Sequence, residues 1–183
     1  GSKTLLAFHG WYDYSYSDET LDKILKRKKQ LWFDRRLKRL GTDLDICQTS
    51  IKRLDNVLSE LDTSNLIVAM HFVPHSRFTM THQRFAPFNA YLGSEKFHQI
   101  FAKHGVKDVV FGHAHRSYGT VTIDGVTYHS RPLGYRREWD LTIDFVSNHP
   151  ELNPTGTWNL SKRYNLVKKR SEFLEYEKKE LAN

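Results

Sequence analysis

The stretch Leu66-Ile67-Val68-Ala69-Met70-His71 decides the fold, because five apolar residues of strand length run directly into a histidine. A short, continuous apolar run is typical of a strand that is buried on both faces of a sheet. We therefore predict a buried strand over residues 66–70 that carries His71 at its carboxyl end.

The segments on either side of this strand predict two helices and a second strand of the same kind. Upstream, apolar residues recur every three or four positions over residues 44–61, which is the pattern of an amphipathic helix. Downstream, Ser94 can cap a helix that Gly105 ends, and the apolar run 106–111 follows. A helix between two apolar strands predicts a layered α/β domain.

Four more strands and a terminal helix complete the expected elements. An apolar run near the start of the chain can form a further buried strand, and the pair Asp124-Gly125 predicts a two-residue hairpin turn. Alternating character predicts one more strand after the hairpin, and a charged segment ends the chain as a helix. These strands cover residues 4–8, 120–123, 126–129 and 141–146, and the C-terminal helix covers about residues 157–183.

Length and composition fit one globular domain. The chain has 183 residues, of which 39% are apolar and 13% are aromatic, and this content supports a sizeable core rather than disorder over the whole length. We expect a single domain over residues 1–183. It is predicted to be an α/β sandwich with mixed sheets and with a helical insertion at about residues 17–62.

Basic residues are concentrated in that insertion. Lys plus Arg exceed Asp plus Glu by 28 to 21, and the net charge of +7 modestly favours an anionic partner over a cationic one. Lys and Arg are densest over residues 23–39, where interspersed apolar side chains allow an amphipathic helix. This segment is either a solvated basic face or a surface that recruits phosphates or nucleic acid, and periodicity does not decide between them.

Cysteine usage and hydropathy predict a cytoplasmic protein. The single cysteine, Cys47, excludes an intrachain disulfide and fits a reducing compartment, and its place in an apolar helical stripe predicts a buried packing role. No stretch approaches the ~18 apolar residues of a membrane span, so no membrane partner is expected.

Three histidines at two strand ends are the strongest chemical signal. His113 and His115 are two residues apart after the second apolar strand, and His71 follows the first. Functional groups in open α/β sheets collect beyond the carboxyl ends of the strands, so these imidazoles are expected at one edge. Neutral imidazole is a ligand for transition-metal ions, and the sequence therefore predicts a metal site.

These motifs resemble a known family. The order of elements is an apolar strand ending in His71, a helix, and a second apolar strand leading into the Gly-His-Ala-His motif at residues 112–115. This order looks like the end of the calcineurin-like metallophosphoesterases. The Gly-Trp-Tyr-Asp-Tyr-Ser segment at residues 10–15 is similar to the middle of bacterial predicted phosphohydrolases in that superfamily. The resemblance covers about residues 4–146.

What the resemblance implies is a phosphoester hydrolase with two transition-metal ions of the Mn, Fe or Zn type. By position in the motif, His71 and His113 would bind one metal and His115 the other. None of the three would donate the proton to the leaving group, so the resemblance assigns no catalytic residue to this chain.

The chain departs from the family pattern before these histidines. The Asp-x-His, Gly-Asp and Gly-Asn-His motifs that come first in the family are missing, and with them the carboxylates and the usual catalytic histidine. The chain is therefore expected to be the C-terminal portion of a domain, without full activity alone. An incomplete sheet exposes edges and apolar faces, so we expect self-association or association with the missing N-terminal half.

Two loops offer residues for a phosphoester substrate. His75 and Arg77 follow His71, and Arg131 follows the predicted hairpin, and each can contact a phosphate. The competing interpretation is a non-catalytic basic module that binds nucleic acid or a protein partner, in which the histidines are structural or hold one metal.

Overall fold

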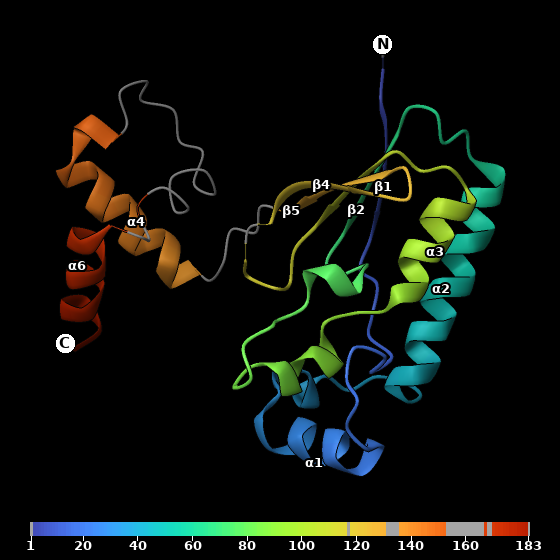
Figure 1. The fold of residues 1–183 in the computed structure, drawn as a ribbon, viewed down its shortest axis with the longest axis horizontal. Helices are drawn as coiled ribbons and strands as arrows, with labels where there is room; N and C mark the ends of the chain where they lie inside the picture. The colour runs from blue at the N-terminus through green and yellow to red at the C-terminus, as the bar shows by residue number, and fades with distance from the viewer. Residues whose placement is uncertain (1, 117, 131–135, 153–166, 168–169, 183) are drawn as a thin grey trace. The chain divides into compact units, whose positions relative to one another are not determined.

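The computed structural model describes residues 2–116, 118–130, 136–152, 167 and 170–182 (Figure 1). The chain divides into two compact units. The first holds Gly1–Ala114 with Tyr118–Ser130, and the second holds His115–Ser117 with Arg131–Asn183. That both units belong to one domain over residues 1–183 stays a prediction.

One mixed sheet organises the first unit (Figure 1). Neighbouring strands run parallel through the first four positions of the sheet, and the last strand pairs antiparallel with its neighbour. The predicted α/β class with a mixed sheet is confirmed. The strand order is β1 (Thr4–Phe8), β2 (Leu66–Met70), β3 (Asp108–Phe111), β5 (Val126–Ser130) and β4 (Gly119–Ile123).

Asp124 and Gly125 form the turn between β4 and β5, as predicted. Both residues have left-handed backbone angles, with φ of 46° and 77°. Two successive residues with positive φ match the twist of an antiparallel pair, which is why Asp-Gly is favoured at such a turn. The turn therefore follows directly from these two residue types.

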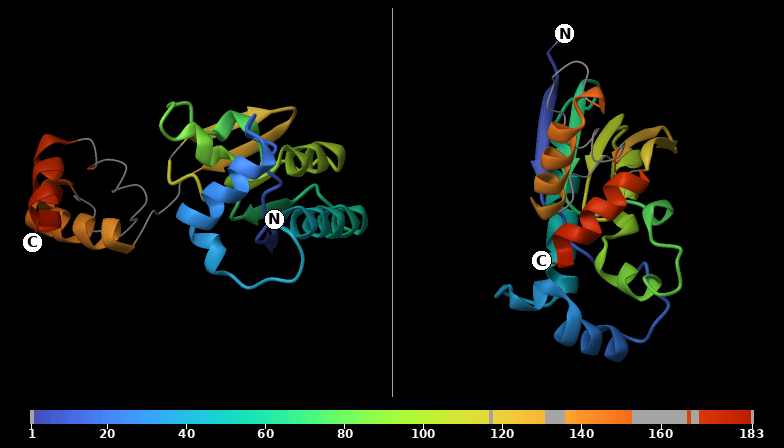
Figure 2. Two further views of the ribbon diagram at one scale, coloured as in Figure 1. Left: turned by 90° about the horizontal axis from the view of Figure 1, so that it is seen from below. Right: turned by 90° about the vertical axis from the view of Figure 1, so that its left-hand side faces the viewer.

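Two helices pack beside the sheet, and both begin at side-chain caps. Helix α2 (Asp43–Glu60) starts with a capping box, in which Thr42 and Asp45 each accept the other's backbone amide. Helix α3 (Glu95–Lys103) starts at Ser94, whose hydroxyl accepts a backbone amide of the first turn. Figures 1 and 2 show from several directions that α2 and α3 run side by side.

The core of the first unit lies between these helices and one face of the sheet. Phe8 of β1 contacts Phe97 and Phe101 of α3, with ring centroids 5.7 and 6.4 Å apart. Cys47 of α2 is fully buried, and burial raises the pKa of its thiol to about 12. The predicted packing role of Cys47 is confirmed, because a thiol of this kind stays protonated and unreactive at neutral pH.

Shorter helices connect these elements. Helix α1, η1 and α2 lie within the region, residues 17–62, in which a helical insertion is expected. No helix in the described parts of the chain has both the length and the apolar character needed to cross a bilayer. The short helices of the first unit are α1 (Leu21–Leu31), η1 (Phe33–Arg36), η2 (Ser76–Phe78) and η3 (Ala86–Tyr91).

The second unit is helical, and it corrects one prediction. Residues 141–146 were expected to form a strand, but they lie within helix α4 (Arg136–Asn148). Leu141 and Phe145 are four residues apart and therefore share a helix face, and they pack in a cluster with Phe173. The helical spacing of these apolar residues thus determines the structure here, rather than the alternation of apolar and polar residues. The unit also contains η4 (Pro150–Leu152) and α6 (Ser171–Ala182). Residues 157–166 of the expected C-terminal helix lie outside the described residues.

The opposite face of the sheet is largely open, which corrects the expectation that residues 4–8 are buried. Leu5 is 66% exposed and Val110 is 43% exposed. In the pairing register, Leu5 stands beside Ile67, and Ala7 beside Ala69. β1 is an edge strand, so among the described strands of this sheet it has a neighbour on one side only. The result is a row of apolar side chains exposed on the sheet.

We expect this open face to cause association of the purified chain. Replacing Leu5 with lysine should reduce the association measured by sedimentation velocity over a concentration series, because a charge is costly to bury in an apolar contact. Leu40 is 98% exposed and is not part of the sheet, so Leu40→Lys is the matched control. A chain that stays monomeric at every concentration would contradict the expectation, as would an equal effect of both variants.

Candidate functional site at the carboxyl ends of the strands

Three adjacent parallel strands end side by side, and a histidine follows each of them. Phe8, Met70 and Phe111 are the last residues of β1, β2 and β3, and they are partners in the pairing register. His9 and His71 come directly after the first two strands, and Gly112-His113 follows the third. Parallel strands share one carboxyl edge, so their pairing alone places the three histidines there.

The rings of these histidines lie close to one another. The ring centroids of His9 and His71 are 5.2 Å apart, and those of His71 and His113 are 4.6 Å apart. Backbone hydrogen bonds fix this arrangement, since the His9 carbonyl accepts the His71 amide at 3.2 Å and the His71 carbonyl accepts the Gly112 amide at 3.3 Å. The structure therefore brings the predicted ligands His71 and His113 together.

Hydrogen bonds indicate which ring nitrogens of two of these histidines lack a proton. His113 Nε2 lies 3.1 Å from the Tyr91 carbonyl, and His9 Nδ1 lies 3.3 Å from the Gly10 carbonyl. A carbonyl oxygen can only accept, so each of these nitrogens carries the proton of a neutral ring. The other nitrogen, His113 Nδ1 or His9 Nε2, then has the lone pair that a metal ion requires.

The backbone at the third strand end is unusual. His113 has a φ of 62° and His115 a φ of 48°, in the left-handed region that residues with a Cβ rarely adopt. Such conformations cost on the order of 1–3 kcal/mol and cluster at functional sites. His115 belongs to the second compact unit, so its grouping with His71 and His113 stays a prediction.

Aromatic side chains surround the three histidines. Phe72 contacts the His113 ring, Trp32 approaches it from η1, and Trp11 stacks on His9, with centroids 4.5, 6.0 and 5.9 Å apart. His9 was not among the ligands predicted from the sequence, although it follows a strand just as His71 does. These rings hold the imidazoles in place, although His9 and His71 stay exposed to solvent.

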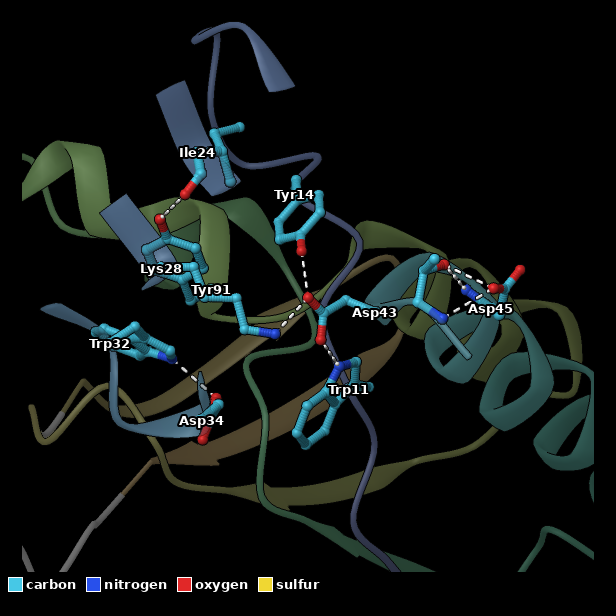
Figure 3. Close-up of polar contacts among 10 residues, drawn as sticks. Trp11, Tyr14, Ile24, Lys28, Trp32, Asp34, Asp43, Asp45 and Tyr91 are labelled. Carbon is cyan, nitrogen blue, oxygen red and sulfur yellow. Dashed lines mark hydrogen bonds and ion pairs between the residues drawn. The ribbon is translucent and has the colours of Figure 1, made fainter. Parts of the chain in front are cut away.

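A buried carboxylate holds the aromatic segment in place (Figure 3). Asp43, at the start of α2, accepts hydrogen bonds from Trp11 Nε1 at 2.9 Å, from the Tyr14 hydroxyl and from Lys28 Nζ. Burial opposes ionisation of Asp43, but the bonds from Lys28, Tyr14 and Trp11 outweigh it and keep the pKa of Asp43 below its ordinary value. The segment that follows His9 is therefore anchored to both α1 and α2.

A groove of about 440 Å³ runs between β1 and α2 and reaches His9. Arg39 and Arg53 line it together with the hydroxyls of Thr49 and Ser50. The Arg39 guanidinium lies 4.1 Å from the centre of the Trp11 ring, and this contact orients it beside the histidine edge. The groove thus combines cations and hydroxyl donors, which are the groups that bind phosphate oxygens.

The predicted substrate residues lie in different surroundings. His75 Nδ1 accepts the Arg77 amide at 3.0 Å at the start of η2, and Arg131 lies outside the described residues. His75 also meets Glu95 and His98, and the potential ligand atoms of these three residues all lie within 4.8 Å of one another. Burial lowers the pKa of His75 below its ordinary value, against the attraction of Glu95. The structure therefore contains a candidate metal-binding group at residues that were not predicted as ligands.

His98 is buried on α3. It is 5% exposed, because it faces Tyr128 of β5 and the hairpin turn. A histidine can be buried wherever both ring nitrogens find partners, and helical periodicity does not report those partners.

No family model matches the chain, and no curated protein matches it. A crystal structure of phosphopantetheinyl hydrolase from Mycobacterium tuberculosis is similar to it, with a TM-score of 0.60 and 21% sequence identity. The match covers 75% of this chain and 52% of that one, so this chain spans about half the length of the hydrolase. A likeness at this identity shows the fold.

The predicted membership in the calcineurin-like metallophosphoesterases is therefore wrong. No family model supports it, and the similar solved structure is a phosphopantetheinyl hydrolase. The physical reason is that a strand, a histidine, a helix and a strand followed by Gly-His-x-His describe only one edge of a parallel sheet, which many α/β proteins can present. This chain is an α/β protein whose fold is similar to that of the hydrolase.

Proposed function

We propose that the chain forms part of a metal-dependent hydrolase of phosphoester bonds. The observation that carries the proposal is the row of three imidazoles at the carboxyl edge, from His9, His71 and His113. In His9 and His113, the hydrogen bond made by one ring nitrogen indicates that the other nitrogen is unprotonated. A residue set made of neutral imidazoles suits a divalent transition-metal ion. The name of the similar structure, a phosphopantetheinyl hydrolase, supports hydrolysis as the reaction class.

The histidines and their neighbours would have different roles in such a hydrolase. His71 and His113 would hold a metal ion, with His115 as a further predicted ligand. When bound, the ion supplies Lewis-acid polarisation of a phosphoryl oxygen. The Tyr91 carbonyl fixes the tautomer of His113, and Phe72 and Trp11 contact the rings of His113 and His9.

Arg39 and Arg53 would bind the substrate's phosphate oxygens in the groove next to His9. Both guanidinium groups are exposed and line the same groove. Arginine presents several N–H groups in a fixed plane that matches phosphate geometry, and it stays charged throughout the working pH range. We therefore assign substrate binding to this groove in addition to the predicted residues His75, Arg77 and Arg131.

The test is hydrolysis of 4-nitrophenyl phosphate by the purified chain with added Mn²⁺ or Zn²⁺. Hydrolysis should exceed that of the metal ion alone and should stop when EDTA is added, because the metal polarises the phosphoryl group. Elemental analysis after dialysis gives an independent measure of bound metal. Failure to bind any transition metal and to hydrolyse the ester under all these conditions would remove the proposal.

A basic binding module is the second candidate, and α1 supports it only in part. Lys23, Lys26 and Lys29 of this helix are exposed, but Arg27 pairs with Glu19 and Lys28 pairs with Asp43. Two of the five cations are therefore used within the fold. Binding of nucleic acid that weakens steeply with salt and does not need metal would favour this candidate over the hydrolase.

A further inference from the structure

A loop and a helix of the first unit bring a second set of metal-ligating side chains together. His75 comes from the loop after β2, and Glu95 and His98 come from the first turns of α3. One ligand atom from each residue lies within 4.8 Å of the others. None of the three belongs to the histidine row at the strand ends.

The distances in this cluster are close to those of a metal site. His75 Nε2 lies 3.1 Å from Glu95 Oε1, and the ring centroids of His75 and His98 are 4.6 Å apart. Glu95 and His98 are three residues apart on α3, so they share one helix face. In a tetrahedral site with bonds of about 2.0–2.1 Å, ligand atoms lie about 3.3 Å from each other. The His75–Glu95 pair already has about that separation, and the other ligand atoms lie within 4.8 Å of one another.

A further carboxylate and an orienting group lie next to His98. His98 Nε2 lies 3.1 Å from Asp124 Oδ2, at the tip of the β4–β5 hairpin. The Tyr128 hydroxyl lies 2.7 Å from the other nitrogen, His98 Nδ1. A ligating histidine is commonly held by such a partner on its second nitrogen, which fixes the ring and its tautomer. The His98 side chain is 7% exposed, so this orientation is firmly set.

We propose that His75, Glu95 and His98, with Asp124 as the fourth ligand, bind a divalent transition-metal ion of the zinc type. Two imidazole nitrogens and two carboxylate oxygens match the ligand preferences of Zn²⁺. The site shares only His75 with the residues predicted to bind substrate, and its metal binding does not depend on the proposed hydrolase function.

Binding exchanges protons within the cluster. The Arg77 amide donates to His75 Nδ1, so in the metal-free protein the proton of the neutral His75 ring lies on Nε2, which faces Glu95. When a metal takes Nε2, that proton moves to Nδ1, and the Arg77 amide loses its acceptor. At His98, the proton on Nε2 that faces Asp124 moves to Nδ1, which then donates to the Tyr128 oxygen. Binding thus replaces the Arg77–His75, His75–Glu95 and His98–Asp124 hydrogen bonds with bonds to the metal.

The site would tie together three parts of the fold. The loop from His71 to His75 would be fixed to α3 and to the hairpin turn. A shallow surface groove gives an ion access, lined by residues 75–77 on one side and by residues 121–123 of β4 on the other. The metal would therefore act as a structural clamp on the loop that follows His71.

The experiment is titration with Zn²⁺ in competition with a chromophoric chelator, in a chain that carries His71→Ala and His113→Ala. This background should still bind one Zn²⁺ per chain. Adding Glu95→Gln, which keeps the shape but removes the charge, should lower the affinity at least about tenfold. Adding His104→Gln is the matched control. His104 comes directly after α3 and, like His75, pairs with a carboxylate, which is that of Asp55 at 2.6 Å.

The outcomes separate clearly. A background chain that binds no Zn²⁺, or equal affinities in the Glu95→Gln and His104→Gln variants, would overturn the site. Circular dichroism of the same samples shows whether each variant is folded. If the background does not fold, the chain with only Glu95→Gln is compared with the unaltered chain. Loss of one zinc equivalent in that variant supports the site, and an unchanged stoichiometry and affinity overturn it.

Discussion

Replacing His71 or His113 with alanine is expected to lower metal-stimulated phosphoester hydrolysis by at least about 100-fold, which corresponds to about 2.7 kcal/mol of transition-state stabilisation. The physical reason is that each imidazole supplies a bond to the ion, and the two rings lie 4.6 Å apart at the edge. The measurement is the initial rate with saturating metal, together with the metal content of each variant. Loss of bound metal should accompany loss of activity.

A histidine outside the edge provides the control for this prediction. His82 lies in the loop before η3, where its ring contacts Phe85 and its Nδ1 accepts the Arg84 amide. His82→Ala should leave both the rate and the metal content unchanged. If His82→Ala and His71→Ala reduced the rate equally, the edge would not be the metal site.

Replacing Asp43 with alanine is expected to destabilise the fold by about 3 kcal/mol. Asp43 is the common acceptor for Trp11, Tyr14 and Lys28, as Figure 3 shows, and its side chain is 9% exposed. Its removal leaves a largely buried ammonium and a phenol without their acceptor, and unpaired groups of this kind carry most of the cost. The free energy of unfolding can be measured by urea denaturation at neutral pH.

The Asp43 carboxylate also makes the stability of the fold depend on pH. Its folded pKa lies below the ordinary value of 3.8, so its contribution is fully present above that value and is lost as the pH falls through the lowered pKa. The unaltered chain should therefore lose stability on acidification more steeply than Asp43→Ala. Asp22 is exposed on α1, so Asp22→Ala serves as the control and should change the stability by less than about 0.5 kcal/mol. Equal effects of both substitutions would contradict the assigned role.

The elements that could be predicted are those whose signal is local. β2 and β3 are apolar runs, α2 carries an apolar stripe, and Asp124-Gly125 is a turn pair, so residue types alone define them. The strand expected at residues 141–146 failed because alternation over six residues competes with the helical spacing of Leu141 and Phe145. A short segment does not reveal which period tertiary packing will favour.

The candidate site was predictable only where a strand leads directly into a histidine. His71 and His113 followed from that rule, and His9 obeys it too, although it was not predicted as a ligand. The cluster of His75, Glu95 and His98 was invisible in the sequence, because its members come from a loop and a helix that only the folded sheet brings together. Asp124 and Tyr128 join it from the hairpin for the same reason.

The position of β1 at the edge of the sheet also has a consequence for folding. β1 pairs with β2, and the chain must pass through α1, η1 and α2 before that pairing can form. A contact so distant in sequence closes late, and an edge strand is the first to open in a native-state fluctuation. His9 would then leave the edge while His71 and His113, on β2 and β3, keep their places. The completeness of the histidine row therefore depends on an edge strand of the sheet.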